Sequence, residues 1–229
     1  TFRLCCTIVM QMNPIILQPG DEERLESFLL PLLDSSMFLI GNMRQVGIVD
    51  TGERLSGTYA VSIEGDQISG VVGHFWNGNL ITQAPLAAIS DLWRGAVRTS
   101  GRPVRGVVGP AAQVQVIKDE LQIGEERLQL DAVEQLYSLT LAELQIPPPL
   151  ATGKVTARPI HRHDLDLLTA WRVGYEIESL YCEDTPALWE RCRESIQRLL
   201  DEKTAWILED AGRPVATSAF NAVSYTHLR

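Results

Sequence analysis

The stretch that decides the fold is residues 59–83, which read YAVSIEGDQISGVVGHFWNGNLITQ. Two apolar runs, 59–63 and 68–76, flank a turn cluster of Glu, Gly, Asp and Gln, and Asn77-Gly78 then leads into a third run, 79–83. An Asn-Gly pair between such runs is the strongest short signal for a β-hairpin. The stretch therefore predicts three consecutive antiparallel strands.

Helical patterns precede these strands. Residues 13–17 read as a short strand, and Asp21 can cap a helix whose apolar side chains recur at helical spacing as far as Leu33. Ser35 or Ser36 can cap a second helix, which Gly47 would end.

Helix and strand patterns also follow the three strands. They predict helices over 86–100 and 111–122, and strands over 104–108, 127–130 and 134–141. The complete order is β-α-α-β-β-β-α-β-α-β-β. This order predicts an α+β domain over 13–146, with a mixed, mainly antiparallel sheet and helices on both faces.

A boundary follows at Pro147-Pro148-Pro149, because proline cannot continue a helix or an interior strand. Residues 147–153 are therefore expected to form a linker. The order then begins again over 154–222, with a strand, a helix capped by Asp164, a helix opened by Thr185 and Pro186, and strands over 205–208 and 215–220.

The two halves read as an internal repeat. Glu64 and Glu209 each end a strand before a turn, Phe75 and Phe220 each end the next strand, and each pair is separated by the same interval. The alternative is two unrelated α+β units.

Composition excludes several classes of protein. The 229 residues are 45% hydrophobic, and 29 acidic against 20 basic residues give a net charge of −9. This rules out a mainly disordered chain and argues against binding to a nucleic-acid backbone. No apolar run reaches the ~20 residues of a membrane span, so no membrane partner is expected. The cysteines and histidines lack the spacing of metal ligands, which favours no metal site and reduced thiols in the cytoplasm.

Both ends of the sequence differ from the rest. Residues 1–12 begin with Thr and are expected to be a non-native or disordered extension, with Met10 or Met12 as the natural start. Residues 223–229 read as a foreign tail, so we expect the sequence to be a fragment of a longer parent.

The order of elements resembles the GNAT (general-control-related N-acetyltransferase) fold. Several short stretches of the sequence also resemble bacterial proteins with two such units in tandem. The stretches that carry this resemblance are 34–39 (DSSMFL), 76–79 (WNGN), 101–106 (GRPVRG), 168–173 (LTAWRV) and 220–222 (FNA). The resemblance implies one complete, degenerate GNAT-like domain followed by the first half of a second.

In this family acetyl-CoA lies between two splayed strands, and its pyrophosphate is held by a loop of pattern Q/R-x-x-G-x-G/A at the start of a helix. Backbone N–H groups at such a helix start form an anion site. The corresponding residues here are Gln83, Ala84, Pro85, Leu86, Ala87 and Ala88. Leu86 stands in place of the glycine and Pro85 has no N–H to donate, so we expect a degenerate loop that does not bind the cofactor.

The equivalent loop of the second repeat would follow residue 222. The resemblance therefore implies that the parent transfers acetyl groups from acetyl-CoA to an amine of a small molecule or peptide, and that this chain is inactive and binds acetyl-CoA weakly. The alternative is a non-enzymatic module that binds a ligand or a protein.

Acidic residues gather at the expected connection between the first two helices of the second repeat, which lines the acceptor cleft in GNAT folds. A carboxylate of Glu176, Glu178, Glu183 or Asp184 could orient an amine there, and Tyr181 and Asn221 could contact it. The alternative is a solvated acidic loop. The catalytic residues stay unknown. His74 is expected to be a core or edge histidine, and His161 and His163 capping or surface groups.

The strand predicted over 215–220 has no predicted neighbour on one side. Unpaired strand edges recruit other chains, so we expect self-association through this strand.

Overall fold

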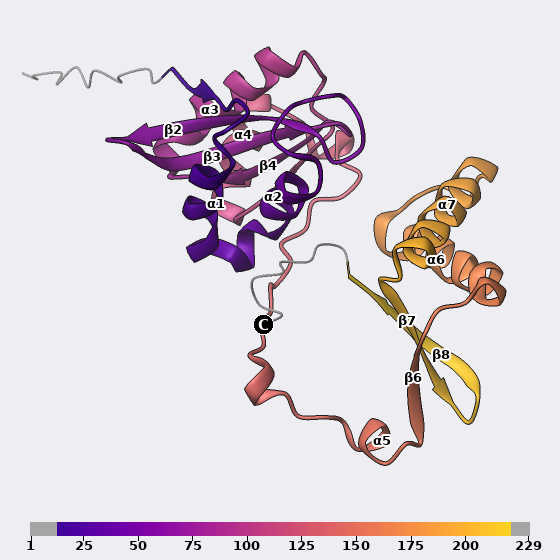
Figure 1. Cartoon of the computed structure of the whole chain (residues 1–229). Helices are drawn as coiled ribbons and strands as arrows, with labels where there is room; N and C mark the ends of the chain where they lie inside the picture. Colours follow the sequence, from indigo (N-terminus) through magenta and orange to yellow (C-terminus); the bar gives the residue numbers. More distant parts are fainter. Residues whose placement is uncertain (1–12, 221–229) are drawn as a thin grey trace, which may run out of the picture. The chain divides into compact units, whose positions relative to one another are not determined.

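The structure is a computed structural model, and it describes residues 13–220 (Figure 1). The chain divides into two compact units, the first ending at Gly124 and the second beginning at Glu125. Each unit has its own sheet and its own apolar core.

The first unit follows the predicted order as far as its last helix. Its elements are β1 (Ile15–Ile16), α1 (Glu22–Leu29), η1 (Leu30–Leu32), α2 (Leu33–Val46), β2 (Gly57–Glu64), β3 (Gln67–Phe75), β4 (Asn79–Gln83), α3 (Leu86–Ser100), β5 (Gly106–Val108) and α4 (Ala111–Leu121). The sheet order is β1-β2-β3-β4-β5. The first four strands pair antiparallel, whereas β4 and β5 pair parallel because α3 carries the chain back between them.

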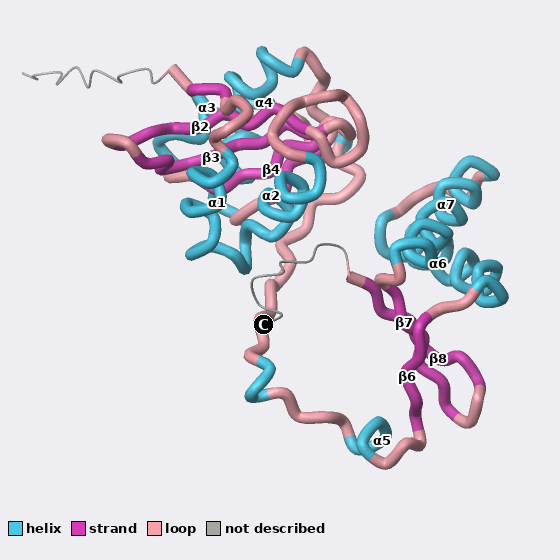
Figure 2. The backbone as a smooth tube through the Cα atoms, in the orientation of Figure 1, coloured by secondary structure: helices cyan, strands magenta, loops and turns pink. Residues whose placement is uncertain are grey.

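Helices cover both faces of this sheet, as predicted (Figure 2). Alternate side chains of its strands pack against the helices on one face or the other. Tyr59 and Val61 of β2 belong to the core with α1 and α2, and Ala60 between them belongs to the core with α3 and α4. Successive side chains of a strand point to opposite faces, so one strand serves both cores.

The predicted caps of the second helix are wrong. This helix begins at Leu33, with neither Ser35 nor Ser36 at its N-cap. The 3-10 turn η1 leads directly from α1 into α2, so helical backbone already precedes the serines. Ser35 donates instead to Leu32 O and to Gln83 Oε1, the latter at 2.8 Å.

The two strands predicted over 127–130 and 134–141 are also wrong. The structure has short 3-10 turns, η2 (Glu125–Arg127) and η3 (Leu141–Glu143), and otherwise irregular chain in this segment. Alternating hydrophobicity indicates which residues would share a face of a strand, but a strand is stable only beside a partner that the pattern does not specify.

The second unit repeats the first half of this order. Its elements are α5 (Pro148–Ala151), β6 (Val155–Pro159), η4 (Arg162–Asp164), α6 (Leu165–Leu180), α7 (Pro186–Glu202), β7 (Ala205–Asp210) and β8 (Arg213–Ala219). The sheet is antiparallel in the order β6-β7-β8. Ala205 and Ile207 of β7 pack with Leu168 of α6 and Ile196 of α7.

The hairpins β2–β3 and β7–β8 share an irregularity. The pairing shifts register at Ser62/Ile63 in the first hairpin and at Leu208/Glu209 in the second, and two residue pairs separate each shift from a two-residue turn. The residue equivalent to Glu64 is therefore Asp210. The predicted pairing of Glu64 with Glu209 is wrong by one residue, because β7 ends at Asp210 and not at Glu209.

Candidate functional site

The loop predicted to correspond to the family's pyrophosphate loop lies where β4 meets α3. Gln83 ends β4, Ala84 and Pro85 form the bend, and α3 begins at Leu86 with Pro85 as its N-cap. The sequence therefore located this strand–helix bend correctly. We call residues 83–88 the β4–α3 corner.

Three polar groups of this corner, the amides of Ala84 and Ala88 and the side chain of Gln83, bond within the protein. The Ala84 N–H donates to Gln113 Oε1 at 3.1 Å, and the Ala88 N–H donates to the Pro85 carbonyl at 2.9 Å. Gln83 is buried, and its side chain accepts from Ser35. The bend thus offers an anion neither the Ala84 amide nor one from Pro85. Gln113, on α4, has no counterpart in the predicted loop, and no sequence pattern indicates its contact with Ala84.

Close packing fills the space around the corner. A methyl group placed on Gly70 of β3 would lie 2.7 Å from Ala84 Cβ and 3.0 Å from Pro85 Cδ. Strands β4 and β5 pair as far as Ile81–Val108, and a methyl group on the next residue, Gly109, would lie 2.1 Å from Thr82 Oγ1. The two strands therefore stay in contact at least as far as Thr82 and Gly109.

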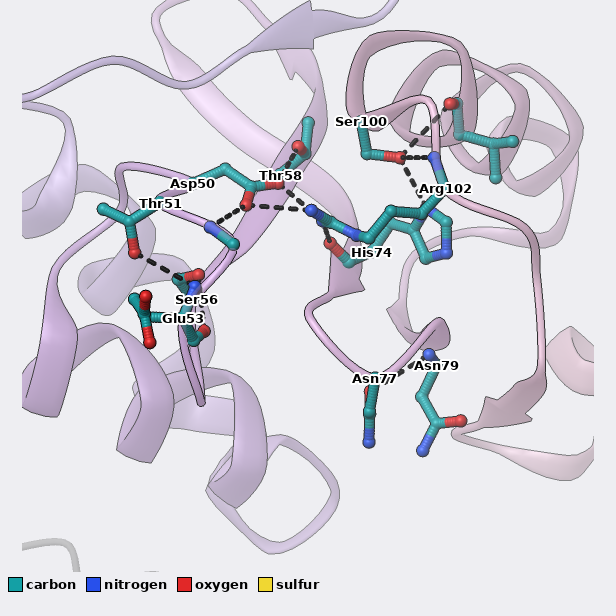
Figure 3. Close-up of polar contacts among 12 residues, drawn as sticks. Asp50, Thr51, Glu53, Ser56, Thr58, His74, Asn77, Asn79, Ser100 and Arg102 are labelled. Atoms are coloured by element: carbon teal, nitrogen blue, oxygen red, sulfur yellow. Dashed lines mark hydrogen bonds and ion pairs between the residues drawn. The ribbon is translucent and has the colours of Figure 1, made fainter.

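A polar cluster lies at the opposite end of β4 (Figure 3). Arg102 donates to both carboxylate oxygens of Asp50, at 3.0 and 2.5 Å, and to the His74 carbonyl at 2.7 Å. Thr58 Oγ1 donates to Asp50 at 2.6 Å. Burial opposes the charge on Asp50, but bonds from Arg102, Thr58 and the Gly52 amide hold its pKa below the usual value. Arg102 therefore ties the loop after α2 to the end of β3.

His74 lies beside this ion pair and is fully buried, as expected of a core histidine. Its Nδ1 is 2.7 Å from Ser100 Oγ. Burial lowers the pKa of His74, and the charge of Arg102 lowers it further, whereas the backbones of Gly78 and Pro103 act in the opposite direction. The His74 imidazole is therefore closed to solvent, whereas Ser100 is partly exposed.

The acidic residues of the second unit are arranged differently from the prediction. Glu176 and Glu178 lie within α6 instead of the connection after it, because the helix runs to Leu180. Glu176 is buried and accepts from Arg172 at 2.7 Å and from Arg191 of α7 at 3.3 Å, while the Cys182 thiol lies 3.5 Å from its Oε2. This carboxylate already has two guanidinium partners and is not free to hold an amine.

The remaining predicted residues are dispersed. Glu178 is exposed on α6, and Tyr181 is 68% exposed at the end of that helix. Glu183 and Asp184 are exposed in the connection, where Asp184 accepts from the Trp189 indole at 2.8 Å. Asn221 lies outside the described residues. The structure therefore does not assemble these side chains into one site.

The histidines at the start of the second unit have local roles. His161 forms a capping box with Asp164 in η4, and the Asp164 carboxylate accepts from the His161 N–H at 2.8 Å. Bonds from Arg158, offset by burial, bring the pKa of Asp164 to about 2. Asp164 thus secures the turn before α6, and its side chain does not cap α6 itself.

No family model matches the chain, and no curated protein or solved structure matches it either. Over residues 13–220, no helix has the length and apolar character needed to cross a bilayer. Within the same residues, no three His, Cys, Asp or Glu side chains are grouped so that they could hold a metal ion.

Proposed function

We propose that the chain is built from GNAT-type units and that its first unit is a non-catalytic copy. The order β-α-α-β-β-β-α-β-α, with β4 and β5 parallel, supports the resemblance. The second unit supports it too, because it repeats the βααββ part with the same hairpin irregularity.

The β4–α3 corner carries this proposal. It stands where the resemblance places the acetyl-CoA loop, yet Gln113 occupies the Ala84 amide and Gly109 closes β5 on Thr82. Acetyl-CoA does not fit these residues, so no catalytic step involves the first unit. Its role is to stabilise or position the remainder of the protein.

Acetyl transfer from acetyl-CoA to an amine of a small molecule or peptide would then belong to the second unit of the complete protein, in the cytoplasm. The described part of that unit holds only β6, α6, α7, β7 and β8. The equivalent elements of the first unit precede β4 and the β4–α3 corner, where the resemblance places the cofactor loop. We therefore expect this chain by itself to bind acetyl-CoA weakly and to show no transferase activity.

Calorimetric titration with acetyl-CoA tests this assignment. The chain as given should give no heat of binding at micromolar concentration, whereas the same open reading frame expressed to its natural stop codon should bind and release free CoA with an amine acceptor. Leu86→Asp in the longer protein is the matched control. It should leave acetyl-CoA binding unchanged, since Leu86 is half exposed and lies at a corner where we expect no cofactor to bind. Tight binding by the chain as given would contradict the assignment.

A second candidate function is a non-enzymatic module that binds a ligand or a protein. The filled β4–α3 corner favours it, because an enzyme of this class needs that space open in at least one unit. Failure of the longer protein to bind acetyl-CoA would establish this candidate over the first.

A further inference from the structure

Two cysteines share the small core between α6 and α7. Cys192 of α7 is buried with Val173 and Leu188, and Cys182 of the connection before α7 packs against this core. Both thiols are free, and Cys182 is partly exposed whereas Cys192 is closed to solvent. Redox-sensing cysteines are accessible thiols that often lie beside a second, resolving cysteine. The pair therefore has the arrangement of a site for thiol oxidation.

Polar groups surround the Cys182 sulfur. It accepts from the Gln129 side chain at 3.7 Å and from Arg191 Nη2 at 3.9 Å. It also donates to Glu176 Oε2 at 3.5 Å, which gives its proton an acceptor. N–H donors and a guanidinium beside a sulfur stabilise the negative charge that it carries when it attacks a peroxide.

The charges of this cluster add to that effect. Glu176 bonds to the guanidiniums of both Arg172 and Arg191, so two positive charges stand against one negative charge. The two acidic residues that follow Cys182 in the sequence are exposed, and water screens their charges. The excess of positive charge makes Cys182 the nucleophilic member of the pair.

Cys192 is suited to the second step. Burial raises the pKa of its thiol, the negative charges of Glu176 and Cys182 add to the rise, and two guanidiniums oppose it. A buried thiol that keeps its proton does not meet peroxide first. Residues 181–185 form neither helix nor strand, so Cys182 can approach Cys192 without the loss of either element.

We propose that Cys182 is a peroxide-reactive thiol and that Cys192 resolves its oxidised form into a disulfide. The Cys182 sulfur attacks one oxygen of a hydroperoxide and the O–O bond breaks. A sulfenic acid forms, and the other oxygen leaves with the proton that the thiol has lost. The Cys192 sulfur then attacks the Cys182 sulfur, the S–O bond breaks, and the hydroxyl leaves as water with the proton of the Cys192 thiol. The two thiols together lose two electrons, which the peroxide takes up.

Peptide mapping of the oxidised chain tests this proposal, and the test needs no acetyl-CoA, so its outcome is separate from that of the proposed function. The chain carrying Cys5→Ser and Cys6→Ser keeps only Cys182 and Cys192. After a small excess of hydrogen peroxide it should lose two hydrogen atoms in mass and show no cross-linked dimer on a non-reducing denaturing gel. Trypsin should release peptide 173–191 joined to peptide 192–193 by a disulfide that reduction separates. In the same background, Cys192→Ser should stop at a sulfenic acid on Cys182, which dimedone traps.

A pair of arginine variants tests the role of the positive charge. Arg191→Gln should slow the loss of the Cys182 thiol about threefold or more, because the sulfur loses its guanidinium contact. Arg193→Gln is the matched control on the same helix and should leave the rate unchanged, since Arg193 bonds to Asp166 of α6. Circular dichroism of each variant confirms the fold, which should persist because the Arg191 and Arg193 side chains are 62% and 52% exposed.

Three results would overturn the proposal. The first is a chain whose two thiols stay reduced under peroxide that oxidises free cysteine. The second is a disulfide that joins two chains instead of peptides 173–191 and 192–193 of one chain. The third is an equal rate of oxidation in Arg191→Gln and Arg193→Gln.

Discussion

Arg102 connects segments that are far apart in the sequence. It reaches Asp50, 52 residues earlier, and the carbonyl of His74, 28 residues earlier. Its side chain is 22% exposed and that of Asp50 is 19% exposed, so both charges are largely removed from water. Removing one member of such a pair leaves the other charge without a partner.

We therefore expect Arg102→Ala to lower the free energy of unfolding by about 2–3 kcal/mol, as measured by urea denaturation. Arg94→Ala is the matched control, because Arg94 is 50% exposed in its pair with Glu120 and should contribute under about 1 kcal/mol. Equal losses in the two variants would show that the Asp50–Arg102 pair is no stronger than a surface pair.

His74 gives the first unit a stability that depends on pH. Burial, assisted by the charge of Arg102, lowers the pKa of His74 below its usual value near 6.5. Below pH 6.5 the unfolded chain takes up a proton that the folded chain does not. The folded state therefore loses up to about 1.4 kcal/mol for each unit that the pH falls, until His74 itself is protonated.

The measurement is the melting temperature between pH 7 and pH 5 for the parent chain and for His74→Asn, which keeps a polar atom near Ser100. The melting temperature should fall less between pH 7 and pH 5 in His74→Asn than in the parent chain. Parallel curves would mean that His74 does not control the acid sensitivity.

Individual residues differ in how well the sequence predicts them. Burial of His74 was predictable because it interrupts an apolar strand, and Pro85 and Leu86 could be read from a local pattern. The ion pair of Glu176 with Arg191 was not predictable, since Arg191 lies 15 residues away on another helix. Asp50 had a weaker signal, because Asp followed by Thr and Gly is typical of a turn in which the carboxylate accepts a backbone N–H.

At the scale of elements, the turn between β7 and β8 places an alanine, Ala211, in a backbone conformation that does not favour it. Ala211 has φ of +49° and Gly212 has φ of +77°, the backbone of a two-residue hairpin turn in which both central residues are left-handed. A residue with a Cβ pays a steric cost in that region, whereas Asn tolerates it.

Ala211→Asn should therefore raise the free energy of unfolding of the second unit by about 0.5–1 kcal/mol, seen as a higher melting temperature. Ala211→Val is the matched control and should lower it, because β-branched side chains fit this conformation worst. A stabilising valine would contradict the turn geometry.

Most elements could be predicted because each carries its own signal. The hairpin signals of 59–83 gave β2, β3 and β4, and Thr185 caps α7 as predicted, accepting from the Leu188 N–H at 3.2 Å. The strands predicted over 127–141 failed because pairing depends on a partner elsewhere. Self-association through 215–220 stays a prediction, although β8 is an edge strand among the described residues.

At the scale of the whole molecule, the apolar cores of the first unit share no element with the core of the second. Leu25, Tyr59 and Phe75 belong to the first unit, and Leu168 and Ile207 to the second. Each core buries its own apolar surface, and the connection between them is irregular and exposed. Cooperativity requires shared packing, so each unit is expected to unfold by itself.

Calorimetry should accordingly resolve two transitions, and the variants above identify them. Arg102→Ala should lower only the transition of the first unit, whereas Ala211→Asn should raise only that of the second, because the two sites lie in different cores and distant effects add independently. Arg102→Ala combined with Ala211→Asn should move both transitions by the same amounts as the single changes. A single transition that both substitutions shift would instead show that the units fold as one body, and would contradict the division of the chain at Gly124.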